Sequence, residues 1–264
     1  MPPIICVVSL GRGRGKTRLI EWLIEKLSNE GVRIATIKHS MEPIDLRGKD
    51  TYRHLEAGAA ETCYISPREL AILRRSSGSI EEAISSLNPD HDLILVEGFK
   101  RSPYPKILCA ESLEEAREAI KQIENIIAVT GESIPGSGEI DGVKLLDRDR
   151  VLKLVKGLVV ESWIKGVPNL NCGKCRYGSC GKLIEAIKRG EATIRDCAMR
   201  RFLAAKITID GVEVPLGAWP QQLLRELLRA FIRSLKLRDL RLEDARRVVV
   251  EIDLGGVEAG ESAR

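Results

Sequence analysis

Residues 4–17 read IICVVSLGRGRGKT, and this stretch determines the fold of the first part of the chain. Its first half is apolar and β-branched, which predicts a buried strand over residues 4–10. Its second half is rich in glycine, and the apolar residues that follow recur at helical spacing, which predicts a helix over residues 16–29. Glycine lets backbone N–H groups approach phosphate oxygens, and the start of a helix adds a favourable dipole. The stretch therefore predicts a phosphate-binding loop.

The residues of this loop have different expected roles. We expect Lys16 to reach the β- and γ-phosphates of a nucleotide and the Thr17 hydroxyl to bind Mg2+. The usual pattern G-x-x-x-x-G-K-[ST] would put a glycine at Leu10, so the start of the loop departs from it. A glycine-rich turn with a surface lysine is the alternative. The candidate nucleotide contacts are Gly11, Arg12, Gly13, Arg14, Gly15, Lys16, Thr17 and Arg18.

Strands and helices are expected to alternate beyond the loop. The expected strands are 33–38, 92–97, 106–110 and 126–130, and the expected helices are 50–57, 79–87, 113–123 and 147–160. Residues 61–65 and 69–74 flank Ser66-Pro67 and predict a hairpin at a sheet edge. Alternation of this kind predicts an α/β fold like that of P-loop NTPases, with a mostly parallel sheet covered on both faces.

Two of the expected strands end in chemically useful residues. Glu97 closes a buried strand, and a carboxylate there can hold Mg2+ or polarise an attacking water, so Glu97 is the candidate catalytic residue. A glutamate that only caps the strand is the alternative. Lys38 and His39 close another strand, and ligands of parallel sheets gather at these ends. A solvated pair is the alternative for them.

The composition limits the classes of function. The 264 residues include 42 basic and 38 acidic ones, a mixed balance that does not predict a nucleic-acid partner. Hydrophobic residues make up 44%, which is enough for a packed core. The apolar run at the start is too short to span a bilayer and lacks the features of a signal peptide. A cytoplasmic protein without a membrane partner is therefore expected.

Several strings resemble the molybdopterin-guanine dinucleotide biosynthesis protein B (MobB) family over residues 3–160. They are GKT at 15–17, ATIKH at 35–39, GKDT at 48–51, Arg53, AGA at 57–59, LVEGFK at 95–100 and PKI at 105–107. The resemblance implies a P-loop domain that binds GTP, forms a homodimer and hydrolyses GTP weakly. It also implies an adapter role beside the guanylyltransferase that attaches GMP to molybdopterin, giving the guanine dinucleotide form of the molybdenum or tungsten cofactor.

The resemblance also suggests site residues. It implies that Asp45, Asp50 and Glu97 lie near the metal or the phosphates. Arg18 stands where the family often has threonine, and the histidine-rich stretch expected after His39 is absent. Guanine preference rests on the resemblance alone, and residues 128–132, at the end of a late strand, are the candidates to lie near the base.

A cysteine cluster follows the first domain with the spacing C-x2-C-x4-C-x16-C, formed by Cys172, Cys175, Cys180 and Cys197. Four thiolates can hold a 4Fe–4S cluster or a tetrahedral Zn2+. The wide separation of the last two favours iron–sulfur, and the segment resembles a small four-cysteine iron–sulfur domain of corrinoid and electron-transfer proteins. Zinc and free thiols remain alternatives.

The remaining cysteines, Cys6, Cys63 and Cys109, lie in expected strands and are interpreted as small buried apolar residues.

The chain is thus expected to contain four parts: a P-loop GTP-binding domain (1–165), a four-cysteine module (166–203), a small α+β unit (204–254) and a disordered tail (255–264). The α+β unit is expected to contain strands 206–210, 212–214 and 246–252 and a helix over 219–235. Three functions remain open: the adapter, a P-loop kinase or ligase for a small molecule, and a nucleotide-dependent iron–sulfur redox or sensor protein.

Overall fold

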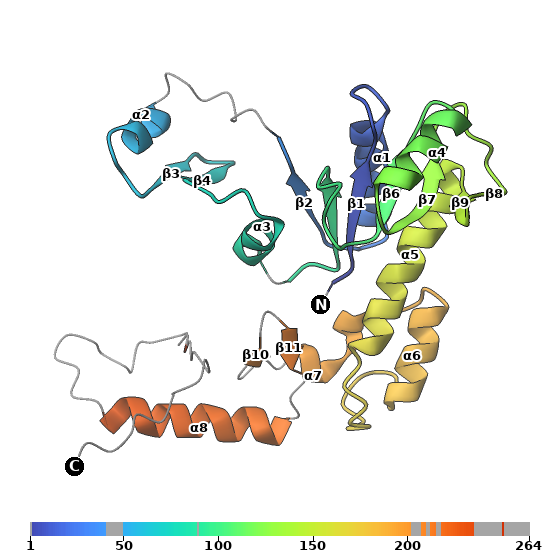
Figure 1. Cartoon of the computed structure of the whole chain (residues 1–264). Coiled ribbons are helices and arrows are strands. Elements are labelled where there is room, and N and C mark those ends of the chain that lie inside the picture. The colour runs from blue at the N-terminus through green and yellow to red at the C-terminus, as the bar shows by residue number, and fades with distance from the viewer. Residues whose placement is uncertain are drawn as a thin grey trace, which may run out of the picture.

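The structure is a computed structural model that describes residues 2–40, 50–88, 90–201, 207–209, 212–214, 218–234 and 250. Its centre is a seven-stranded sheet in the order β2-β5-β1-β6-β7-β9-β8 (Figure 1). The strands are β1 (Ile4–Val8), β2 (Ile34–Lys38), β5 (Leu93–Glu97), β6 (Lys106–Cys109), β7 (Ile126–Thr130), β8 (Glu139–Ile140) and β9 (Val143–Leu145). All neighbours pair in parallel except β8 with β9. The predicted α/β fold with a mostly parallel sheet is confirmed.

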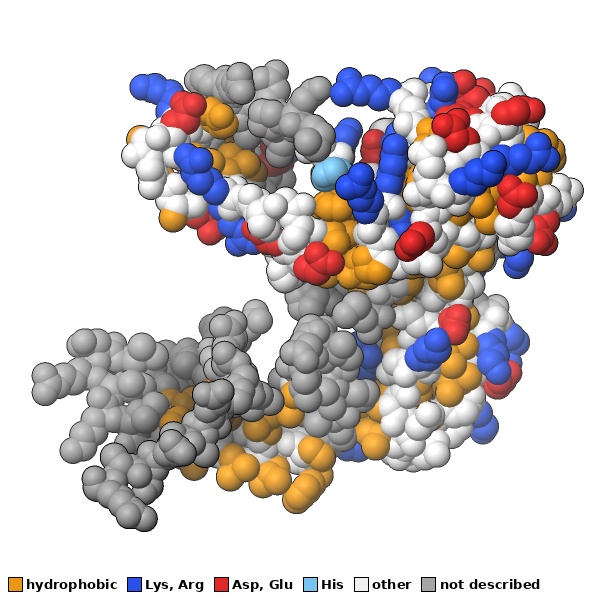
Figure 2. Space-filling view, in the orientation of Figure 1, with side chains coloured by type: hydrophobic (Ala, Val, Ile, Leu, Met, Phe, Trp, Pro, Cys, Tyr) orange, Lys and Arg blue, Asp and Glu red, His pale blue; other side chains and the backbone are white. Residues whose placement is uncertain are grey.

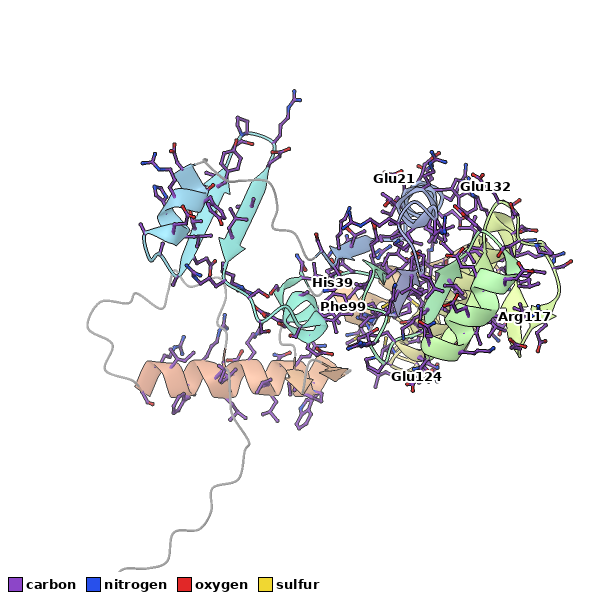
Figure 3. The ribbon with its side chains drawn as sticks, turned by 45° about the horizontal axis from the view of Figure 1, so that its top comes forward. Glu21, His39, Phe99, Arg117, Glu124 and Glu132 are labelled. Atoms are coloured by element: carbon purple, nitrogen blue, oxygen red, sulfur yellow. The ribbon has the colours of Figure 1, made fainter. Side chains whose placement is uncertain are left out.

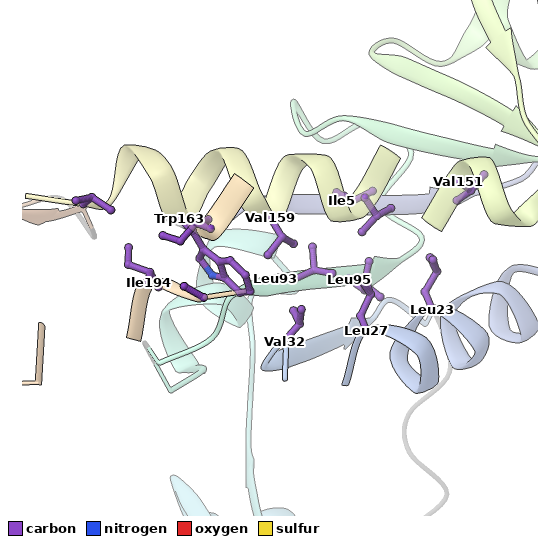
Figure 4. Packing of buried hydrophobic residues seen from close by; sticks show 14 of the residues in the cluster. Ile5, Leu23, Leu27, Val32, Leu93, Leu95, Val151, Val159, Trp163 and Ile194 are labelled. Atoms are coloured by element: carbon purple, nitrogen blue, oxygen red, sulfur yellow. The ribbon is translucent and has the colours of Figure 1, made fainter. Parts of the chain in front are cut away.

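Helices cover both faces of this sheet, because successive side chains of a strand point to opposite sides. In β1, Ile5 and Val7 face α1 (Lys16–Asn29) and α5 (Arg148–Lys165) in one buried cluster. Ile4, Cys6 and Val8 belong to a second cluster with α3 (Ile80–Ser86) and α4 (Leu113–Gln122). Figure 4 shows the first cluster, where side chains of α1 and α5 meet those of β1 and β5. The two layers fix the ends of β1, and with them the position of the glycine-rich loop.

The hairpin predicted over 61–74 forms, but not at the predicted place. Strands β3 (Glu61–Ile65) and β4 (Leu70–Arg74) pair antiparallel in a separate two-stranded sheet beside α2 (Asp50–Glu56). The hairpin at the edge of the main sheet is instead β8–β9, which the sequence pattern did not predict. The expected burial of Cys63 is also wrong: its side chain is exposed, because a two-stranded sheet cannot enclose both of its faces.

The cysteine segment packs against the far end of α5. Its elements are α6 (Cys180–Lys188), the 3-10 helix η1 (Ile194–Asp196) and α7 (Ala198–Arg201). Leu183, Ala186 and Ile187 of α6 lie in the same buried cluster as Val159 and Trp163 of α5. The segment therefore shares its core with the central sheet.

A buried carboxylate joins the cysteine segment to the sheet. Asp92, only 7% exposed, directly precedes β5. Its Oδ1 accepts a hydrogen bond from Trp163 Nε1 of α5 at 2.8 Å, and its Oδ2 accepts from the backbone N–H of Arg33 at 2.8 Å and from Arg195 of η1 at 2.5 Å. Arg195 also donates to the carbonyl oxygen of Gly31. One carboxylate thus connects three elements that are distant in the sequence.

We expect Arg195→Ala to lower the free energy of unfolding by about 1–3 kcal/mol, because a buried carboxylate would lose its charged partner. Chemical denaturation followed by tryptophan fluorescence measures the change, since Trp163 contacts the same carboxylate. Arg189→Ala is the matched control: Arg189 pairs with Glu191 at the surface of the same segment, where an ion pair contributes little. Equal stability of the two variants would contradict a stabilising role of the Asp92 contacts.

The last described elements are β10 (Ile207–Ile209), β11 (Val212–Val214) and α8 (Ala218–Ser234). The predicted antiparallel pair and helix are confirmed. The predicted strand over 246–252 and the tail over 255–264 lie outside the described residues. Figure 2 shows hydrophobic side chains along α8, which carries four large exposed ones: Trp219, Leu223, Leu227 and Phe231. In the described part of the chain, no helix has the length and apolarity needed to cross a bilayer.

Candidate functional site

The glycine-rich loop connects the end of β1 to the start of α1. β1 ends at Val8, so the strand is two residues shorter than predicted and the loop begins at Ser9. Gly13 and Gly15 both have a φ of 77°, a backbone conformation that favours glycine. Gly15 is the N-cap of α1, and the first turn of the helix contains no acidic residue. No side chain therefore caps the first N–H groups of α1, and the helix's own first turn carries no carboxylate that would compete for them, which suits an anion.

Lys16 folds back over this loop. Its Nζ donates to Ser9 Oγ at 2.7 Å and to the carbonyl oxygen of Gly11 at 3.4 Å, and Ser9 Oγ donates to the same carbonyl at 2.6 Å. Ser9 is almost completely buried, so its hydroxyl is fixed in place. Sequence reasoning missed Ser9, although a hydroxyl residue at the end of the apolar run, two residues before the first glycine, was the available signal. Leu10, at the position of the missing glycine, packs against the second buried cluster.

Thr17 and Glu97 meet beside the loop. Thr17 Oγ1 lies 3.2 Å and 3.1 Å from the two carboxylate oxygens of Glu97. The contact arises because β5 pairs with β1 in parallel, with Glu97 opposite Val7, so both strands end at the same edge of the sheet. A hydroxyl and a carboxylate are hard oxygen ligands of the kind that Mg2+ prefers. These two side chains therefore fit a Mg2+ that accompanies phosphates held by the loop.

Lys38 and His39 lie on the other side of Glu97. Lys38 is paired with Glu97 in the register of β2 and β5, and the His39 N–H donates to the Glu97 carbonyl oxygen at 2.9 Å. The rings of His39 and Phe99 are 4.3 Å apart between centroids (Figure 3). Gly98 has a φ of 103°, which favours glycine, and a Cβ there would lie 3.1 Å from the His39 Cβ, so another residue would also press on His39. The structure thus places Lys38 and His39 at the carboxyl ends of the strands, on the same side of the sheet as the loop.

The other acidic candidates do not join this group in the described residues. Asp50 is the first residue of α2, beside the separate β3–β4 sheet, and is ion-paired with Arg53 at 3.6 Å. Asp45 lies outside the described residues.

Two arginines of the loop region are paired with carboxylates. Arg14 forms ion pairs with Glu111 and, at 3.0 Å, with Glu115, which connect the loop to the start of α4. Arg18, in the first turn of α1, lies 4.0 Å from Glu132, which follows β7. Glu97 ends β5, Glu111 follows β6 and Glu132 follows β7, so carboxylates surround the glycine-rich loop and the first turn of α1 from several sides.

A buried lysine supports the segment that follows Glu97. Lys106 is fully buried, and its Nζ donates to the carbonyl oxygens of Ser102 at 2.6 Å and Tyr104 at 3.0 Å. Burial lowers the pKa of this ammonium group. The lysine therefore holds the loop between β5 and β6, which carries Phe99 and Lys100. Lys100 in turn donates to the carbonyl oxygen of Leu10 at 3.2 Å.

The four clustered cysteines differ in burial. Cys180 and Cys197 are buried, Cys175 is half-buried and Cys172 is exposed. The Cys180 Sγ accepts a hydrogen bond from the Asn171 N–H at 3.4 Å. Among the residues that the structure describes, no three Cys, His, Asp or Glu side chains are grouped so that they could hold a metal ion. The four thiols have the chemistry that a cluster or zinc needs, but this structure does not gather them around one point.

The cysteine segment and the glycine-rich loop lie at opposite ends of the strands of the main sheet (Figure 1). The loop is at the carboxyl end of β1, whereas Arg195 contacts Asp92 and Gly31, which precede β5 and β2. A group held by the cysteines would therefore be separated from a nucleotide by the length of the strands, and any influence between them would pass through the shared core.

Two cysteines outside the cluster are confirmed as buried core residues. Cys6 and Cys109 each lie within the sheet, and burial raises the pKa of the Cys109 thiol to about 12. Burial likewise raises the pKa of the Cys6 thiol. Both thiols stay protonated at neutral pH and act as small apolar side chains.

Two parts of the chain are similar to known protein families. The family model for molybdopterin guanine dinucleotide synthesis protein B matches residues 4–132, and a model described as "Putative Fe-S cluster" matches residues 167–199. The crystal structure of Bacillus subtilis MobB matches with a TM-score of 0.49 and 26% identity, over 60% of this chain and 98% of that one.

Two relatives establish the family. The molybdopterin-guanine dinucleotide biosynthesis adapter protein of Haemophilus influenzae is 32% identical over 157 residues, which are 58% of this chain and 84% of that protein. A Bacillus subtilis protein named "Probable molybdopterin-guanine dinucleotide biosynthesis adapter protein" is 36% identical over 132 residues, 48% of this chain and 75% of that one. The chain therefore belongs to the MobB family, and it carries in addition a segment that matches an iron–sulfur cluster family.

Proposed function

We propose that this protein is a cytoplasmic GTP-binding adapter in the biosynthesis of the guanine dinucleotide form of the molybdenum or tungsten molybdopterin cofactor. Nucleotide binding is supported by three groups that meet at the carboxyl ends of β1 and β5: the uncapped start of α1, the Lys16 ammonium and the Thr17–Glu97 pair. The adapter part is supported by relatives named as molybdopterin-guanine dinucleotide biosynthesis adapter proteins.

Each group of the site has a separate task in this proposal. Backbone N–H groups of residues 11–18 hold the phosphate oxygens, and Lys16, which already lies over the loop beside Ser9, neutralises the β- and γ-phosphates. Mg2+ bound near Thr17 and Glu97 neutralises further phosphate charge. Glu97 is the one carboxylate that we assign to hydrolysis. The activity is at most weak in this proposal, because the same carboxylate would also help to hold Mg2+ with Thr17.

We also propose that the protein forms a homodimer through the β3–β4 hairpin. This hairpin exposes four apolar side chains, Tyr64, Ile65, Leu70 and Ile72. Exposed apolar side chains on a small isolated sheet favour association with another chain, and a second copy supplies an identical surface. Sedimentation equilibrium measures the mass in solution, and a mass equal to a single 29.2 kDa chain would contradict the dimer.

The cysteine segment is proposed to hold a 4Fe–4S cluster through Cys172, Cys175, Cys180 and Cys197. The match of residues 167–199 to an iron–sulfur family supports the type of cofactor, and the four thiols supply a complete ligand set. We retain the division into a nucleotide-binding part (1–165), a cysteine module (166–203) and a C-terminal unit (204–254) as part of this proposal.

The adapter role is tested by reconstitution. We expect the purified protein to bind a molybdenum cofactor guanylyltransferase and to increase the amount of guanine dinucleotide cofactor formed from molybdopterin at limiting GTP. Phosphate release in the same mixture should stay slow. No effect on cofactor formation, together with fast phosphoryl transfer from GTP or ATP to a small molecule, would contradict the adapter and favour a kinase.

A further inference from the structure

The start of α1 is contacted from two flanks, and this gives a bound nucleotide a direction. Thr17 contacts Glu97 of β5, whereas Arg18 contacts Glu132 beyond β7. β5 and β7 lie on opposite sides of β1 in the sheet. Figure 3 shows Glu132 on the other side of the blue helix α1 from His39 and Phe99. Thr17 and Glu97 would hold a Mg2+ that neutralises the β- and γ-phosphates, so their flank would take the terminal phosphate, and the sugar and base would extend toward β7.

The loop that carries Glu132 is held at both of its ends. At its start, a Cβ on Gly131 would lie 1.9 Å from the Ala110 carbonyl oxygen, so only glycine fits there. The side chain of Ile134 is buried in the second core cluster. At its far end, the Gly136 carbonyl oxygen accepts a hydrogen bond from Arg150 at 2.6 Å. This anchored backbone presents Glu132 toward the first turn of α1.

The Glu132 carboxylate has no evident role in holding the fold together. Its side chain is 83% exposed, and the ion pair with Arg18 is 4.0 Å long between two exposed groups. Ion pairs of this kind contribute little to stability. A carboxylate held by a rigid loop, close to the phosphate site and accessible to solvent, is instead available to a ligand.

We propose that Glu132 recognises the base of the bound nucleotide and selects guanine. This inference rests on the proposed GTP site. A carboxylate only accepts hydrogen bonds, and guanine presents two adjacent donors, the N1–H and the N2 amino group. Adenine presents an N1 lone pair at the same place, which a carboxylate repels. The guanine preference thus comes from a single acidic residue after β7.

The test exchanges the hydrogen-bonding pattern of this one group. Titrations with GTP, ATP and xanthosine triphosphate are followed by calorimetry for the wild type, Glu132→Gln and the control Glu139→Gln, whose exposed glutamate lies on β8 of the adjacent hairpin. The glutamine amide can accept from N1–H and donate to the O2 of xanthine, but it cannot accept from both donors of guanine. We therefore expect Glu132→Gln to lower GTP affinity roughly tenfold to a hundredfold. Its affinity for xanthosine triphosphate should rise, and its ATP affinity should rise as well, because the repulsion of the adenine N1 lone pair is removed and the amide can donate to it.

The outcomes separate this inference from the one it rests on. A wild type that binds GTP, together with a Glu132→Gln variant of unchanged preference, would overturn the role of Glu132 and leave the phosphate loop intact. A wild type that binds no triphosphate would overturn both. Arg18→Ala gives a further check: if Glu132 acts directly on the base, this variant weakens GTP and ATP equally and keeps the preference for guanine.

Discussion

Lys16→Ala should lower the affinity for GTP by roughly a hundredfold, because a charge-assisted contact to the phosphates would be lost. In the structure the Lys16 ammonium is held by Ser9 Oγ and the Gly11 carbonyl oxygen, both within the loop itself. The lysine is therefore already positioned above the phosphate site before a nucleotide arrives, and little side-chain freedom remains to be lost on binding. Titration with a fluorescent GTP analogue measures the effect.

The control for this prediction is Lys26→Ala on the same helix. Lys26 lies in the last turn of α1, and its ion pair is with the neighbouring Glu25 at 3.8 Å. The two variants lose the same charge, so general electrostatic attraction of the nucleotide is matched, and their thermal unfolding should be similar. GTP affinity that is unchanged in Lys16→Ala, or lowered equally in both variants, would show that the loop is not the phosphate site.

The main sheet was predictable because its central strands, β1, β5 and β6, are buried on both faces. Continuous apolar runs such as IICVV at 4–8 and LILV at 93–96 have no polar alternation and occur in parallel sheets between helices. The helices α1 and α4, which follow β1 and β6, each have one apolar face that packs on the sheet. The meeting of Thr17 with Glu97 also followed from sequence, since the loop that leads to Thr17 leaves the carboxyl end of β1, Glu97 ends β5, and the carboxyl ends of parallel strands lie together.

Other features could not be read from the pattern. The strands β8 and β9 have two and three residues, too few for a periodic signal. The Asp141-Gly142 turn between them, with φ values of 49° and 79°, was the clue that could have revealed this hairpin. The position of β3–β4 was not predictable, because alternation shows that two strands pair but not which sheet they join. The Asp92–Arg195 contact spans 103 residues and has no local signature.

Cys172→Ala and Cys180→Ala should each lose most of the bound iron and the brown colour of the anaerobically purified protein. The wild type should contain about four iron atoms per chain if a 4Fe–4S cluster is present. Cys180 lies in the core, so its replacement alone could act by disturbing α6. Cys172 is exposed and makes no core contact, so its replacement tests ligation without that ambiguity. Iron and sulfide analysis with the visible spectrum gives the measurement.

Cys63→Ala provides the control, because Cys63 is an exposed thiol on β3 outside the cysteine segment. If the cluster is real, this variant keeps its colour while both ligand variants lose it. A colourless wild type containing zinc would replace iron–sulfur by a zinc site with the same four thiols.

A cluster bound at the opposite end of the strands from the loop would also leave GTP affinity nearly unchanged in Cys172→Ala. A large drop there would mean that the shared core of α5 and α6 transmits the state of the cysteines to the nucleotide site.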